Sequence, residues 1–194
     1  PSGTTLEYVK GYVGRTGAVA GIFAVPGLSC DAGATFGNDI TVNDLTIGKG
    51  SGDVDTNTAL GYASLYSNTD GKFNVAVGYR SMLTSTEGDN NTALGMYSLT
   101  TNTTGSHNTA VGVSSLPNNN IGNYNSALGY NAGFDGTTGS NNTYIGYNAQ
   151  PSSATVSNEI VLGDSNVTLI HSAAGMSLDG GATFGGDVNC DVGL

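Results

Sequence analysis

Between residues 57 and 170, one short pattern of apolar and polar positions recurs every 17 residues. Its first copy, at 57–61, reads Asn-Thr-Ala-Leu-Gly, so a polar pair precedes a small apolar residue, a larger aliphatic residue and a glycine. Seven glycines close the copies at constant spacing: Gly61, Gly78, Gly95, Gly112, Gly129, Gly146 and Gly163. A short fixed period without insertions predicts that each copy forms one coil of a solenoid and stacks on the next.

Each coil is predicted to consist of β-strands. A helical repeat requires about 30 residues or more, and the glycine, asparagine and threonine that fill these copies are poor helix formers. We expect two short strands per coil, at 58–62 and 64–66 in the first copy, followed by a turn over 67–74. With about 4.8 Å between stacked strands, seven coils would form a rod of roughly 34 Å.

Two polar columns accompany this pattern. Asparagine stands four residues before six of the repeat glycines, at Asn57, Asn74, Asn91, Asn108, Asn125 and Asn142. Asparagine tolerates left-handed turns, and identical stacked side chains can hydrogen-bond along the stack. We therefore predict a structural turn ladder here, with a sugar or ion site as the alternative. A second glycine column, from Gly71 to Gly139, is predicted to be turn glycine.

The strand pattern also predicts an oligomer. Ala59 and Leu60 are both apolar, although successive residues of a strand face opposite ways, so both faces should be buried. Small alanines suit the interior of a narrow roll, which leaves an aliphatic stripe outside. A stripe of this length is rarely tolerated on a monomer, so chains should pack around an axis. The predicted trimer-axis residues are Leu60, Val77, Leu94, Val111, Leu128, Ile145 and Leu162.

The repeat resembles the Asn-Ser-Val-Ala-Ile-Gly-like head repeats of trimeric autotransporter adhesins. It is closer to the Asn-Thr-Ala-Leu-Gly-Tyr arrays in tail fibres of bacterial viruses, especially cyanophage-type fibres, and residues 158–168 look like the end of such an array. The resemblance covers about 114 of 194 residues. It implies an all-β fold, a trimer of left-handed parallel β-rolls (a β-solenoid with 17-residue coils). Many such fibres continue into a self-cleaving chaperone domain, which the sequence to Leu194 does not contain.

Four segments are expected along the chain. Residues 1–30 would form an N-terminal arm that attaches to other virion or fibre proteins, and 57–170 the seven-coil head. Residues 33–40 reappear in similar form at 181–188, so 31–56 and 171–194 are predicted to be short, intertwined β neck modules. The apolar run at 17–25 is too short to cross a bilayer. This run followed by Cys30 has only a weak similarity to a lipoprotein signal peptide.

Composition narrows the function classes. The chain has 31 glycines, no tryptophan and 10% charged residues, which describes an elongated repeat body better than an ordinary core. Its net charge of -10 would become about -30 in a trimer and argues against nucleic acid and anionic membranes as partners. Cys30 and Cys190 lie at opposite ends of the sequence, so free thiols are expected.

Little in the sequence indicates catalysis. His107 and His171, the only histidines, show no legible arrangement with a nucleophile. We predict no catalytic residue, no metal and no cofactor. Acidic residues in turns leave a glycosidase pair between chains as an open alternative: Asp70, Glu87, Asp89 and Asp135.

Aromatic residues are the candidates for recognition. Tyr62, Tyr79, Tyr130 and Tyr147 each follow a repeat glycine and are expected to pack in a row between coils or chains, or else to form an exposed binding row. Less regular aromatic residues in the turns would be the contacts to a host glycan or protein receptor: Tyr66, Phe73, Tyr124 and Phe134. Polar neighbours would assist them: Asn68, Asp70, Asn123 and Asp135.

Three function classes follow from these observations. The first is a non-enzymatic structural fibre of a bacterial virus, located on the virion, which forms a rigid trimeric rod and takes part in host attachment without inserting into a membrane. The second is the head domain of a bacterial trimeric surface adhesin. The third is a fibre-borne glycan hydrolase.

Overall fold

The computed structural model describes residues 40–42, 45–52 and 54–167 of the chain. The predicted arm (1–30), the second neck module (171–194), most of the first neck module, both cysteines and His171 lie outside the described residues. The described part contains nine strands and no helix. The strands are β1 (Ile40–Val42), β2 (Leu45–Gly48), β3 (Thr58–Leu60), β4 (Val75–Val77), β5 (Thr92–Leu94), β6 (Thr109–Val111), β7 (Ser126–Leu128), β8 (Thr143–Ile145) and β9 (Ile160–Leu162).

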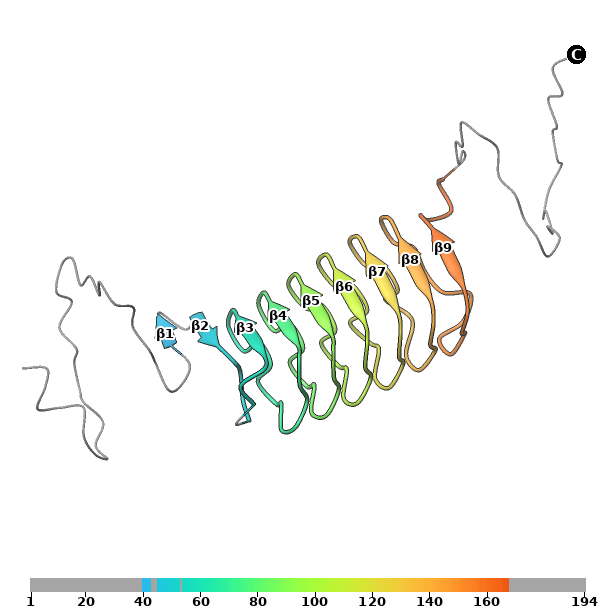
Figure 1. The fold of residues 1–194 in the computed structure, drawn as a ribbon. Coiled ribbons are helices and arrows are strands. Elements are labelled where there is room, and N and C mark those ends of the chain that lie inside the picture. The colour runs from blue at the N-terminus through green and yellow to red at the C-terminus, as the bar shows by residue number, and fades with distance from the viewer. Residues whose placement is uncertain (1–39, 43–44, 53, 168–194) are drawn as a thin grey trace, which may run out of the picture. The chain divides into compact units, whose positions relative to one another are not determined.

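One sheet contains all nine strands in chain order (Figure 1). From β3 to β9 the six pairings are parallel and each keeps the 17-residue offset, as where Ala59 lies opposite Ala76 and Ala110 opposite Ala127. Each coil therefore contributes one strand, and the seven copies complete about six turns. The all-β solenoid with one coil per repeat is confirmed.

The predicted second strand of each coil is wrong. Residues 64–66 form a turn, and the first strand ends at Leu60 rather than at residue 62. Ala63 and Leu65 have φ of 54° and 49°, a left-handed conformation that bends the chain instead of extending it. These turns still join the stack, because the Leu65 N–H donates to the Ser81 carbonyl at 3.1 Å. The equivalent turns of the later coils repeat this geometry.

Close stacking of the coils explains both glycine columns. Gly78 has φ of 134°, and a Cβ at this position would lie 2.6 Å from the carbonyl oxygen of Gly95 in the next coil. Gly71 has no such φ, yet a Cβ there would lie 2.5 Å from the carbonyl oxygen of Gly88. The column at Gly71 is thus required by the approach of the next coil, and the predicted reason, a turn conformation, is corrected.

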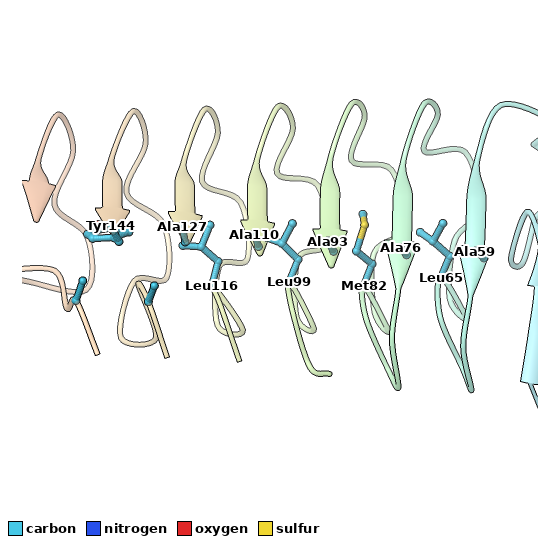
Figure 2. Packing of buried hydrophobic residues seen from close by; sticks show 12 residues of the cluster. Ala59, Leu65, Ala76, Met82, Ala93, Leu99, Ala110, Leu116, Ala127 and Tyr144 are labelled. Carbon is cyan, nitrogen blue, oxygen red and sulfur yellow. The ribbon is translucent and has the colours of Figure 1, made fainter. Parts of the chain in front are cut away.

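The core is a narrow column inside the coils (Figure 2). Strand alanines face inward, as the pattern predicts, and the residue four positions after each of the first four repeat glycines supplies the bulk that fills the space beside them. The buried apolar residues are Ala59, Leu65, Ala76, Met82, Ala93, Leu99, Ala110, Leu116, Ala127, Ala132, Tyr144 and Ala149.

In one pair of core positions the large and the small residue are interchanged. In the four preceding coils a leucine or methionine precedes a strand alanine by 11 residues, as Leu116 precedes Ala127. In the next coil the pair is Gly133 and Tyr144, and a Cβ on Gly133 would lie 2.7 Å from Tyr144 Cδ2. The tyrosine ring therefore fills the volume that the glycine leaves empty. Burial, followed by the charge of Glu159, raises the pKa of Tyr144 to about 12.

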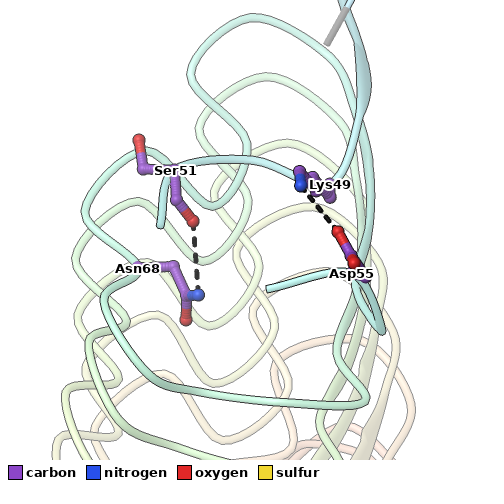
Figure 3. A network of polar contacts seen from close by, with 4 residues as sticks. All are labelled: Lys49, Ser51, Asp55 and Asn68. Atoms are coloured by element: carbon purple, nitrogen blue, oxygen red, sulfur yellow. Dashed lines mark hydrogen bonds and ion pairs between the residues drawn. The ribbon is translucent and has the colours of Figure 1, made fainter. Parts of the chain in front are cut away.

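An antiparallel hairpin closes the first edge of the parallel sheet. β2 pairs with β1 on one side and with β3 on the other, where Ile47 lies opposite Leu60. The segment after β2 then crosses the first coil (Figure 3). Ser51 N–H donates to the Leu65 carbonyl at 3.0 Å, and Asn68 Nδ2 donates to the Ser51 carbonyl at 3.3 Å. The described residues of the predicted first neck module thus pair with their own chain.

An ion pair lies within this crossing segment. Lys49 Nζ donates to Asp55 Oδ1 at 2.7 Å (Figure 3). The hydrogen bond, and then the charge of Lys49, lowers the pKa of the Asp55 carboxyl below its ordinary value of 3.8. Because Asp55 is fully exposed, water screens the pair and its contribution to stability is small.

Candidate functional site

A continuous aliphatic stripe runs along the outer face of the parallel sheet. The third residue of each strand from β3 to β9 is aliphatic and points outward, and none of these side chains is buried within the single chain. Leu94 and Leu128 are 47% and 53% exposed. The shallow groove between Val111 and Ile145 follows the same face. The seven predicted trimer-axis residues that form this stripe are Leu60, Val77, Leu94, Val111, Leu128, Ile145 and Leu162.

An aromatic column runs beside the stripe. Tyr62 stacks on Tyr79 with ring centroids 5.3 Å apart, and Tyr130 stacks on Tyr147 at 5.6 Å. Between these pairs the column contains Met96 and Val113 in place of tyrosine. The tyrosines pack between coils and also stay exposed, so the column extends the apolar face and keeps ring edges accessible to a ligand or a neighbouring chain.

The asparagine column four residues before each repeat glycine lies inside the coils. Asn91 Oδ1 accepts the backbone N–H of Asn108 at 2.9 Å, and its Nδ2 donates to the Gly105 carbonyl at 2.9 Å and to Asn74 Oδ1 at 3.1 Å. The left-handed backbone conformation occurs one residue before the asparagine of this column, for example at Asn90. Since these amides are buried and bonded to the chain, they have no free face for a sugar or an ion. The buried members are Asn57, Asn74, Asn91, Asn108, Asn125 and Asn142.

A second buried amide column was missed by sequence reasoning. It lies seven residues after the repeat glycines and contains Asn68, Ser85, Asn102 and Asn119, all buried. Asn119 Nδ2 donates to Asn102 Oδ1 at 2.9 Å. The recurrence of asparagine at the 17-residue spacing was the available signal. The prediction that Asn68 assists an exposed receptor site is therefore wrong, because its side chain faces the interior.

A third ladder runs in the opposite direction along one corner of the coils. The Lys72 N–H donates to Asp89 Oδ1 at 2.7 Å, and the Ser106 N–H donates to Asn123 Oδ1 at 2.7 Å. Here the side chain of the later coil accepts from the backbone of the earlier one. Asp89 and Asn123, two of the polar candidates in the turns, thus hold adjacent coils together.

The four candidate receptor contacts lie at two separate corners of the coil. Phe73 and Tyr124 share one column, three coils apart, and Tyr66 and Phe134 share another, four coils apart. All four are exposed, from 38% for Phe134 to 65% for Tyr66. Tyr124 stacks on His107 with ring centroids 4.9 Å apart. Because neither column brings its two members together, these residues form no single pocket.

Within residues 40–42, 45–52 and 54–167 no three histidine, cysteine, aspartate or glutamate side chains gather as metal ligands would. Asp70, Glu87 and Asp135 are exposed, and they lie in different coils. A search of the same residues finds no helix suited to cross a membrane.

Comparisons with models of protein families, with characterised proteins and with solved structures give no match to this chain.

Proposed function

We propose that the chain is a segment of a rigid homotrimeric fibre, in which three left-handed parallel rolls cover one another's aliphatic stripe. The observation that carries this proposal is the stripe itself, which runs in register from Leu60 to Leu162 without a buried member. An apolar face of this length is rarely left in water. Two parallel copies would cover it well, because the 17-residue period would bring the same residue types together at every coil.

In this proposal the role is structural, as part of the attachment fibre of a bacterial virus. Buried, bonded amides and close glycine stacking would make each coil stiff. The repeat resembles the Asn-Thr-Ala-Leu-Gly-Tyr arrays of such fibres, and the N-terminal arm would join other virion proteins. Host contact would fall to the turns, since strands repeat almost unchanged while the turns at 67–73 and 117–124 differ. Threefold display would strengthen weak single contacts through avidity.

The head of a bacterial surface adhesin is the second candidate. The likeness of the repeat to adhesin head repeats favours it, and the same trimer would serve that role. Antibody labelling in electron micrographs separates the two candidates. Label on the fibres of virus particles supports the viral role, and label on the bacterial surface supports the adhesin.

The trimer is tested by one substitution in the stripe and a matched one outside it. Leu94→Asp would place three unpaired carboxylates near one axis, a cost of several kcal/mol. Thr104→Asp adds the same charge to the same coil at an exposed turn. By light scattering we expect a trimer for Thr104→Asp and dissociation or failure to assemble for Leu94→Asp. Equal masses for both variants would count against the stripe as the interface.

The role of the turns is tested with residues that other copies already carry. Tyr66→Thr and Phe134→Thr copy Thr100, while Phe73→Asn and Tyr124→Asn copy Asn90. Purified trimer should compete with virus particles for host cells, and the fourfold variant should compete less. An intact variant trimer that competes as well as the natural chain would show that these four aromatic residues are not the receptor contacts.

A further inference from the structure

The end of the solenoid at β9 contains a polar hollow. Its volume is about 720 Å³, within the range of about 300–1,000 Å³ that is usual for ligand pockets. The hollow lies between the last two described coils. Its aromatic and polar lining residues are Tyr147, Asn148, Gln150, Asp164, Ser165 and Asn166, and Leu162 of the aliphatic stripe borders it.

The repeat changes character at this place. The residue after each earlier repeat glycine is tyrosine, methionine or valine, but Asp164 follows Gly163. Gln150 likewise occupies the position that holds a core leucine or methionine in the first four coils, as Leu116 does. Apolar positions thus become polar on two adjacent coils, and both of the new polar side chains line the hollow.

Tyr147 presents an open ring face at this hollow. Its side chain is 65% exposed and stacks on Tyr130 at 5.6 Å with 10° between the ring planes. The stack stops there, because the next member of the column is Asp164 instead of an aromatic residue. The second ring face therefore has no aromatic partner among the described residues.

The polar groups around this ring are held in fixed positions. Asp164 Oδ1 and Oδ2 accept from the backbone N–H and the Nδ2 of Asn166, each at 2.9 Å. Gln150 Nε2 donates to Asn148 Oδ1 at 3.1 Å and to the Asn131 carbonyl at 2.6 Å. Among the described residues each Asp164 carboxylate oxygen accepts one bond, which leaves it further lone pairs, and the Asn148 side-chain amide is used only as an acceptor, which leaves its donors for a ligand.

We propose that this hollow binds a neutral carbohydrate, an inference that rests on the proposed attachment function and names its receptor class. The apolar C–H face of a pyranose ring would stack on the open face of Tyr147. Neighbouring sugar hydroxyls would donate to Asp164 and accept from the Asn148 amide. An anionic sugar is disfavoured, because Asp164 lines the hollow and the chain carries a net charge of -10.

The proposal is tested on the full chain by saturation-transfer NMR with the methyl glycosides of glucose, galactose and mannose, and with sialic acid as the anionic comparison. We expect at least one neutral glycoside to bind and sialic acid not to bind. Tyr147→Ala should weaken binding roughly tenfold, because the stacking face is lost. Tyr147→Phe, which keeps the ring, should retain binding, and Asp164→Ala should weaken it.

Tyr62→Ala is the matched control, since Tyr62 belongs to the same column and stacks on Tyr79 far from the hollow. It should bind as the natural chain does. Absence of binding by any neutral glycoside overturns the site, as does binding that Tyr147→Ala and Asp164→Ala leave unchanged. Light scattering is recorded separately: a trimer without sugar binding refutes this site alone, and a monomer that binds sugar supports the site while refuting the trimeric fibre.

Discussion

The substitution Ser85→Asn should stabilise the protein, because it repairs a gap in the second buried amide column. Further along this column, Asn119 Nδ2 donates to Asn102 Oδ1 at 2.9 Å. At Ser85 the shorter side chain interrupts the contact. Asn68 Oδ1 and Ser85 Oγ are both buried and have no hydrogen-bond partner. Buried polar atoms in this condition are uncommon and costly.

The magnitude follows from the neighbouring coils. Asn102 Nδ2 lies 2.9 Å from the Cβ position of Gly88, much as Asn119 Nδ2 lies 3.0 Å from that of Gly105. A new amide at position 85 would therefore accept from Asn102 and donate to Asn68. Each buried hydrogen bond contributes about 0.5–1.5 kcal/mol net, and ordering the longer side chain offsets part of the gain. We expect about 1–2 kcal/mol of added stability.

Urea unfolding at one fixed chain concentration measures this effect, since the stability of an oligomer depends on concentration. Ser85→Ala is the control and should change the free energy of unfolding little, because it removes one unpaired atom and adds no amide. Asn102→Ser copies the gap into the next coil and should destabilise by about 1–3 kcal/mol. A neutral or destabilising Ser85→Asn together with a neutral Asn102→Ser would refute the reasoning.

Three further predictions concern the core, the period and the Lys49–Asp55 ion pair. Tyr144→Ala should lower the free energy of unfolding by about 3–5 kcal/mol. Adding Gly133→Leu should recover part of this loss, because it restores the large and small pair of the first four coils. If chemical denaturation shows that the losses of the two substitutions simply add, the two side chains do not complement each other. Deleting residues 91–107 removes one period of 17 and should leave a shorter folded solenoid, whereas deleting half a period should abolish the cooperative melt; similar melting of both would count against stacked coils. The Asp55 carboxyl should titrate below 3.8 by NMR and return towards that value in Lys49→Ala. Since the folded pKa is lowered, this small stabilisation is present above 3.8 and is lost as the pH falls through the folded pKa; an unchanged titration in the variant would mean that Lys49 is not the cause.

The period made the solenoid predictable, because an unbroken 17-residue spacing leaves few other ways to stack the chain. The inward alanine followed from strand alternation. The turn at 64–66 could not be predicted, since alanine and leucine have no intrinsic preference for the left-handed conformation seen at Ala63 and Leu65. Hydrogen bonds to the next coil maintain that conformation, and they depend on the stack as a whole.

The surfaces were predictable only where the period could be applied to them. The positions of Tyr66 and Phe134 differ by four whole periods, so arithmetic alone places them in one column away from Phe73. Burial of Asn68 was harder to foresee, because asparagine is common in exposed turns. The hollow at the end of the solenoid combines residues from two coils that are unremarkable singly, and their closeness appears only once the coils are stacked.

Sedimentation equilibrium of the unmodified full chain tests most directly the central claim that the aliphatic stripe is covered by two further copies. The account predicts a single species of three times the chain mass whose molecular weight stays constant on dilution. A monodisperse monomer would contradict it, because the stripe from Leu60 to Leu162 would then remain in water.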